Sequence, residues 1–266
     1  MKDFNPNELL IEKVRAVEEY DPATSELTGR YTNIEDPSLK LSADGTPVTD
    51  AMKAEITTFY GAQTGVFGFS NSLFSVDLAA SQFGSKKEIA SESNKMIVPI
   101  SETITIGSDH TVVLKYVPVG TVGAEVKYVK VINENNNFGK TYEVSATAGE
   151  GKFTLDAATK TITLPDDVTG RVFVRYDAET ATAVKVTKRT DGVPEIKSLL
   201  IHVIFHEVCN ANVVYAGVIS VPRAQIDPSS VEISLKSDGK HAASYKLQKN
   251  YCSEDAKLLD IIVFED

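Results

Sequence analysis

Histidines, cysteines and clustered carboxylates are the side chains of this sequence that could support chemistry. His202 and His206 stand four residues apart, a spacing that lets two imidazoles reach one zinc ion when the segment is a helix. Residues 199–209 are rich in branched and aromatic side chains, which favour a strand. Along a strand the two histidines would stand about 13 Å apart, too far to share one ion. We therefore predict no metal site here and interpret both as partly exposed polar residues of a strand.

The two cysteines and the acidic clusters predict no site either. Cys209 and Cys252 are too few for a disulfide framework. They could pair if they were neighbours in a sheet, but we expect reduced, buried thiols without a catalytic role. Asp166 and Asp167 stand in a turn, and residues 253–255 precede the last apolar run. Neither cluster has the alternating oxygen ligands and central glycine of a calcium loop.

The sequence lacks the short motifs of nucleophilic catalysis and nucleotide binding. It contains no G-x-S-x-G, no G-x-G-x-x-G and no P-loop. Gly65 and Gly68 stand alone, and His110 and His241 are isolated in turn-like contexts. We expect no catalytic residue, no metal ligand and no cofactor, and we expect that the protein is not an enzyme.

The most apolar stretch of the chain positions both central histidines. Residues 199–209 and 213–221 are rich in Leu, Ile, Val, Phe and Tyr, and residues 210–212 (Asn-Ala-Asn) suit a short hairpin loop. The first run is apolar at both odd and even positions, so we expect a central hairpin that is covered on both faces. Pro222 is expected to end it, because proline cannot donate to a ladder.

The N-terminal third is expected to be mostly extended. Residues 9–19 fit either a helix or a strand, and we favour a hairpin with residues 27–32 across the Asp21-Pro22 turn. Residues 43–47 (Ala-Asp-Gly-Thr-Pro) predict a turn, and residues 54–60 a strand that leads into a glycine-rich extended run. After Pro222 we expect strands at residues 231–235, 243–247 and 257–264, with a hairpin turn at residues 237–239.

Residues 71–83 break this β pattern and predict one amphipathic helix. Its N-cap would be Ser70 or Ser72, and Gly84 stands where a helix ends in a left-handed glycine. We expect the helix to pack on a sheet through four apolar side chains, namely Leu73, Val76, Ala80 and Phe83.

The middle of the chain has a different texture, with short runs and regularly spaced turns. We expect strands at residues 111–117, 126–132, 153–155, 160–164, 171–176 and 182–188, which is typical of a small Ig-like β-sandwich. The sequence therefore predicts a mainly β protein with two domains. Residues 1–110 and 191–266 would form a β-sandwich or barrel with one flanking helix, and residues 111–190 would be inserted into it.

Charge and hydropathy narrow the classes of function. The chain has 266 residues and a formal net charge of −10, which argues against tight binding to nucleic-acid phosphates. It contains no run of eighteen apolar residues, so we expect no membrane span. Its N-terminus has acids and no apolar core, so we expect no secretory signal.

One family resemblance is carried by several stretches, namely residues 71–84, 99–100, 153–164, 170–176, 209–222, 237–241 and 258–266. Together they resemble bacteriophage virion structural proteins, most closely major tail tube proteins. The resemblance implies a β-sandwich or barrel subunit that joins others into a hexameric ring, and rings stacked into a hollow tube in a phage tail. It also implies long hairpins and a terminal arm that bridge rings, with an Ig-like insertion outside.

The same resemblance implies the partners. They are other copies of the chain, the tape measure, terminator and baseplate proteins, and a sheath if the tail contracts. DNA would cross the lumen without specific binding, helped by the acidic balance, and the subunit would be made in the host cytoplasm. Residues 1–8 are expected to order only between rings. The alternatives are a head-decoration or other capsid-associated protein, a β-rich binding or adhesion module, and last a carbohydrate-active enzyme.

Overall fold

The structure is a computed structural model that describes residues 8–208, 213–237, 239–250 and 256–265. It divides into two compact units. Unit 1 is discontinuous, formed by Met1–Lys87 and Val186–Asp266, and unit 2 is Glu88–Lys185. The insertion thus starts and ends earlier than the expected 111–190, because the strand Met96–Thr105 pairs along its length with Arg171–Thr180 of unit 2.

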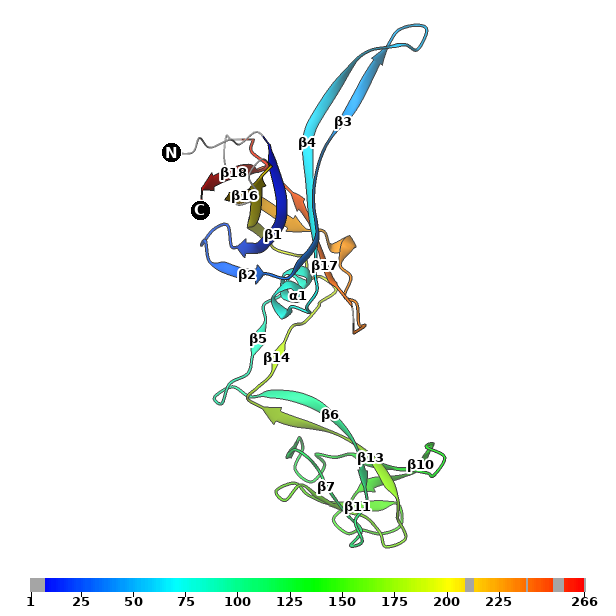
Figure 1. The fold of residues 1–266 in the computed structure, drawn as a ribbon. Helices are drawn as coiled ribbons and strands as arrows, with labels where there is room; N and C mark the ends of the chain where they lie inside the picture. Colours follow the sequence, from blue (N-terminus) through cyan, green and yellow to red (C-terminus); the bar gives the residue numbers. More distant parts are fainter. Residues whose placement is uncertain (1–7, 209–212, 238, 251–255, 266) are drawn as a thin grey trace. The chain divides into compact units, whose positions relative to one another are not determined.

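Unit 1 contains one α-helix and most of the long strands (Figure 1). Its elements are β1 (Leu9–Tyr20), β2 (Leu27–Tyr31), β3 (Ile34–Thr49), β4 (Glu55–Asn71), α1 (Val76–Phe83), β15 (Ile196–Glu207), β16 (Val214–Ile226), the 3₁₀ turn η1 (Pro228–Ser230), β17 (His241–Leu247) and β18 (Asp260–Glu265). The strands form a nearly closed, barrel-like sheet in the order β2-β1-β15-β16-β17-β4-β3, and β18 pairs with β16 beside β17.

The central hairpin is confirmed as β15 paired antiparallel with β16. The odd positions of β15 are buried, but the even positions, including His202 and His206, are half-buried. The described residues therefore cover the second face only in part, contrary to our expectation. Pro222 does not end β16. It stands in the register shift opposite Lys197 and Leu199, where the bulge interrupts the ladder and no N–H donor is required at this position.

The hairpin of β1 and β2 forms as expected, but the predicted turn at residues 43–47 is wrong. β3 runs through that stretch and pairs with β4 from Ile34 to Thr49, with a register shift between Ala43 and Gly45. Asp44 and Gly45 form a β-bulge in the strand and not a turn. β3 and β4 thus form one long hairpin, and its end lies away from the rest of unit 1 in Figure 1.

The expected helix at residues 71–83 forms as α1, but it starts later than expected and buries different side chains. It begins after Ser75, whose side chain accepts from the Leu78 N–H, and it ends at Gly84 in the left-handed conformation as expected. Leu78 is fully buried, whereas Leu73 lies outside the helix and is exposed. Of the four predicted contact residues only Ala80 is buried.

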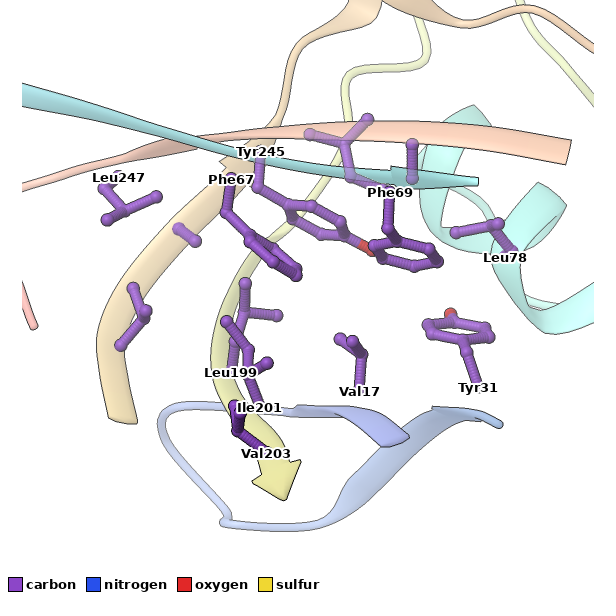
Figure 2. Packing of buried hydrophobic residues seen from close by; sticks show 14 of the residues in the cluster. Val17, Tyr31, Phe67, Phe69, Leu78, Leu199, Ile201, Val203, Tyr245 and Leu247 are labelled. Carbon is purple, nitrogen blue, oxygen red and sulfur yellow. The ribbon is translucent and has the colours of Figure 1, made fainter. Parts of the chain in front are cut away.

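The core of unit 1 lies between the two walls of the barrel-like sheet and the helix. Figure 2 shows Leu78 of α1 reaching toward Tyr31 and Phe69, beside Tyr245 of β17. The rings of Phe69 and Tyr245 are stacked, with centroids 6.2 Å apart. At about 25 cal/mol per Å² of buried apolar surface, these aromatic side chains dominate the free energy of this core.

Unit 2 has short strands around a separate core. Its elements are β5 (Glu88–Ile89), β6 (Met96–Thr105), β7 (Thr111–Val113), β8 (Pro118–Val119), β9 (Tyr128–Ile132), β10 (Phe138–Val144), β11 (Lys152–Asp156), β12 (Thr161–Thr163), β13 (Arg171–Thr180) and β14 (Val184–Lys185). The sheet order is β6-β13-β9-β10-β11-β12-β7, and β5 pairs with β14. Phe153, Ile162 and Val172 are fully buried in this core.

Three details of the strand prediction are wrong. β10 is not among the expected strands. The stretch at residues 182–188 forms only the two-residue β14, and residues 231–235 contribute a single bridge, Ile233 to His241. Part of the predicted turn at residues 237–239 lies outside the described residues. The fold class stands: the protein is mainly β, with a β-sandwich or barrel architecture and one helix.

Candidate interaction surfaces

The structure places His202 and His206 on one face of β15, each beside a different glutamate of β1. The Nε2 atom of His202 lies 3.1 Å from a carboxylate oxygen of Glu18, and that of His206 lies 2.6 Å from Glu12. Desolvation opposes ionisation of Glu18, but hydrogen bonds from Tyr20 and His202 hold the pKa of its carboxyl below its usual value. The two pairs are separate cross-strand contacts.

The other predicted chemistry-bearing residues are not brought together. Asp166 and Asp167 are exposed in a turn of unit 2. Cys209, Cys252 and residues 253–255 lie outside the described residues, as do residues 1–7. Within the described ranges, no three His, Cys, Asp or Glu side chains gather in a way that could hold a metal ion. None of the helices there is long and apolar enough to cross a membrane.

The distal half of the β3–β4 hairpin, residues 42–64, is the most distinctive surface of unit 1, and we call it the distal arm. β17 pairs with β4 only from Gly65 to Asn71, so among the described strands the arm is paired only within itself. Large apolar side chains are exposed along it, with Phe59 67% and Tyr60 73% accessible. Successive residues of a strand face opposite sides, so these two rings put apolar surface on both faces of the arm.

β18 has a second open surface, because one of its two edges is unpaired among the described strands. It pairs with residues 215–220 of β16, and no other described strand pairs with it. Ile261, Ile262 and Phe264 are each 45% or more exposed. An open edge strand with apolar side chains is a site of association unless something pairs with it.

A buried carboxylate holds α1 to the sheet. Glu19 of β1 is fully buried and accepts hydrogen bonds from Ser81 of α1 at 2.6 Å and from the hydroxyl of Tyr245. Burial raises the pKa of the Glu19 carboxyl, although the hydrogen bonds from Ser81 and Tyr245 act in the opposite direction. These hydrogen bonds join β1, α1 and β17, and we call the three residues the Glu19 cluster.

His241, which the sequence placed in an isolated turn, is the centre of a second polar cluster under α1. It is buried at the start of β17, its Nδ1 accepts from the Ser75 N–H at 3.3 Å, and its Nε2 lies 2.7 Å from the side-chain oxygen of Gln82. Gln82 in turn donates to the carbonyl of Ala242 at 2.7 Å. These bonds assign a neutral imidazole with its proton on Nε2, and burial lowers the pKa of His241.

Sequence reasoning missed both clusters, although one carried a sign. Glu19 shares strand parity with the buried Val17, so an acid on an apolar face could have been noticed. His241 gave no such sign, because its partners come from a helix far away in the sequence.

Comparisons with known proteins do not assign the chain to a family: no family model matches it, and no curated protein matches it.

Proposed function

We propose that this protein is a structural subunit of a bacteriophage virion that assembles with copies of itself into stacked rings, the tail tube, through which DNA leaves. The observation that carries the proposal is the distal arm. An isolated two-stranded hairpin is marginally stable in water, and this one exposes large apolar side chains on both faces. Such surface is expected to be buried by a partner.

A second copy is the partner that the remaining surfaces suit best. The open edge of β18 and the outer edges of β2 and β3 leave strands that another copy can extend. The half-buried face of β15 and the apolar residues of β18 would also lose water in a ring. The acidic balance of the chain, −10, suits a lumen that DNA crosses without sticking.

The proposal includes no catalytic role and no cofactor. Tape measure, terminator and baseplate proteins, and a sheath in a contractile tail, would meet the ends or the outside of such a tube. The arm and the β18 edge would serve contacts between copies.

Negative-stain electron microscopy of the purified chain across a concentration series tests the proposal. We expect rings or hollow tubes above a threshold concentration. The double variant Phe59→Ser and Tyr60→Ser should stay small at concentrations where the natural chain assembles. The matched control is Val122→Ser with Leu235→Ser, because these side chains are exposed but lie outside the arm.

Two results would overturn the proposal. One is small particles of the natural chain at every concentration, which would favour a head-decoration protein or a monomeric binding module. The other is normal assembly of the arm variant together with the control, which would remove the arm from the interface.

A further inference from the structure

One face of unit 2 gathers cations and aromatic rings. Along β13, Arg171, Phe173 and Arg175 alternate with Val172 and Val174, which are fully buried, so the three point outward. In the neighbouring strand β9, Lys130 stands opposite Phe173. Alternation puts Tyr128 on the same side as Lys130, because Val129 between them is fully buried.

The next strand adds a third ring to this face. Phe138 of β10 pairs with Ile132 of β9, two residues beyond Lys130, and its side chain is 59% exposed. Its ring meets Phe173 edge-on, with centroids 5.5 Å apart and planes at 66°. On the other side, β6 places Ser101 and Thr103 opposite Arg175 and Phe173. We call this surface the cationic face.

The three cations of the cationic face lack acidic partners. None of Lys130, Arg171 and Arg175 forms an ion pair with any residue in the described parts of the chain. Arg171 instead donates to the amide oxygen of Asn136 at 2.6 Å. The acids on the same side are Glu143, opposite Tyr128, and Asp177, two residues beyond Arg175. Between them the three unpaired cations make a local site for an anion.

The rings of Phe138 and Tyr128 both lie close to the ammonium group of Lys130. The Nζ atom of Lys130 lies 5.7 Å from the centroid of Phe138 and 6.0 Å from that of Tyr128, within the range of a cation–π contact. A ligand for this surface must therefore combine negative charge for the lysine and arginines with apolar C–H surface for the exposed rings. Hydroxyl groups on the ligand would find Ser101 and Thr103 at the edge.

We propose that the cationic face binds an acidic polysaccharide. Carboxylates of the saccharide would contact Arg171, Lys130 and Arg175, since guanidinium groups bind carboxylates through two parallel hydrogen bonds. The C–H faces of the sugar rings would pack on Phe138 and Tyr128. Arg171 and Arg175 are four residues apart on one strand, about 13 Å, so the face accommodates a short stretch of chain with charges at intervals.

A single-stranded nucleic acid is the competing ligand, and the charge distribution of the face disfavours it. Bases bind by stacking on open aromatic faces along a strongly basic groove. Here the cations share their face with the exposed carboxylates of Glu143 and Asp177, so the surface is not a strongly basic groove. This inference is independent of tube assembly, because every residue it uses lies within unit 2.

The test is affinity gel electrophoresis of the full chain, below any concentration at which it self-associates, in gels containing polygalacturonate, neutral dextran or oligo(dT). We expect retardation by polygalacturonate and none by dextran. The double variant Arg171→Gln with Arg175→Gln should weaken the affinity for polygalacturonate by roughly tenfold or more, because hydrogen bonds to charged groups are lost.

Two further variants make the test specific. Lys115→Gln with Lys160→Gln changes the charge by the same amount beside β7 and β12, and it should leave retardation unchanged. Phe138→Ala should weaken binding, and Phe138→Tyr should restore it. The proposal is overturned if the natural chain ignores polygalacturonate, if both double variants behave alike, if dextran retards the chain equally, or if oligo(dT) retards it more strongly.

Discussion

Replacing Glu19 tests whether the Glu19 cluster holds α1 to the sheet. Glu19→Ala leaves the hydroxyls of half-buried Ser81 and fully buried Tyr245 without their acceptor. An unsatisfied buried polar group costs about 1–3 kcal/mol. Because Ser81 is only half-buried, the two together should lower the free energy of unfolding by less than twice that cost, about 2–5 kcal/mol. Glu19→Gln keeps the shape and one acceptor oxygen, and should therefore cost much less at mildly acidic pH.

The pH dependence of the free energy of unfolding distinguishes the effect of the Glu19 charge from the effect of the side chain's shape. The folded state raises the pKa of Glu19 above its unfolded value of 4.5, so the folded chain holds this proton more tightly than the unfolded chain. The resulting stability is fully present below the unfolded pKa and is lost as the pH rises through the folded pKa. Glutamine has no such proton, so the free energy of Glu19→Gln relative to the natural chain should rise with pH.

Hydrogen exchange measured by mass spectrometry suits this experiment, because the two units have separate cores and global unfolding need not be one transition. Peptides from β1, α1 and β17 report the stability of the cluster, and peptides from unit 2 serve as the internal control. The reasoning is refuted if Glu19→Gln and the natural chain differ by the same free energy at pH 5 and pH 9.

Three other outcomes follow from the same contacts. Leu78→Ala should destabilise unit 1 by about 2–5 kcal/mol because its side chain is fully buried, whereas Val76→Asp should cost less because Val76 is only half-buried at the start of the helix; chemical denaturation of both variants checks the order, and a larger loss for Val76→Asp would contradict this packing. Because burial lowers the pKa of His241, its contribution to stability is present above its usual pKa of 6.5 and is lost as the pH falls through the folded value; the protection of α1 peptides, measured relative to the intrinsic exchange rate at each pH, should fall on acidification, and less so in His241→Gln. Joining Ile89 to Val184 by a short Asn-Gly turn should leave unit 1 folded, since these residues pair across β5 and β14; circular dichroism of the shortened chain checks this, and loss of the strand spectrum would refute it.

The parts of the fold that the sequence predicts are those decided within a few residues. The turn between β1 and β2 forms because the side chain of Asp21 accepts from the N–H groups of Ala23 and Thr24. The end of α1 follows from Gly84. Its φ of 62° lies in the left-handed region that favours glycine, and an added Cβ would lie 2.0 Å from the carbonyl oxygen of Val193. Both features can be recognised from residue type alone.

The parts that the sequence does not predict depend on distant partners. Ser70, Ser72 and Ser75 are all acceptable N-caps by residue type. The structure uses Ser75, whose N–H also donates to His241. Asp44 and Gly45 read as a turn, yet pairing with residues 60–63 of β4 keeps them in a strand. The cationic face was not foreseen either, because it needs the register of three strands.

The insertion also bears on how unit 1 closes. β1 and β15 pair residues that are nearly two hundred positions apart, Leu10 with His206, and such distant pairing is slow and costly in chain entropy. Unit 2 is continuous, and its ends meet where Glu88 pairs with Lys185 and their side chains form an ion pair of 2.8 Å. Once unit 2 has folded, its residues no longer add to the loop that β1 and β15 must close. With closure entropy growing as (3/2)RT ln n, removing about 100 residues from that loop lowers its cost by roughly 0.5–1 kcal/mol. The inserted unit, with its own core, therefore assists the folding of the sheet into which it is inserted.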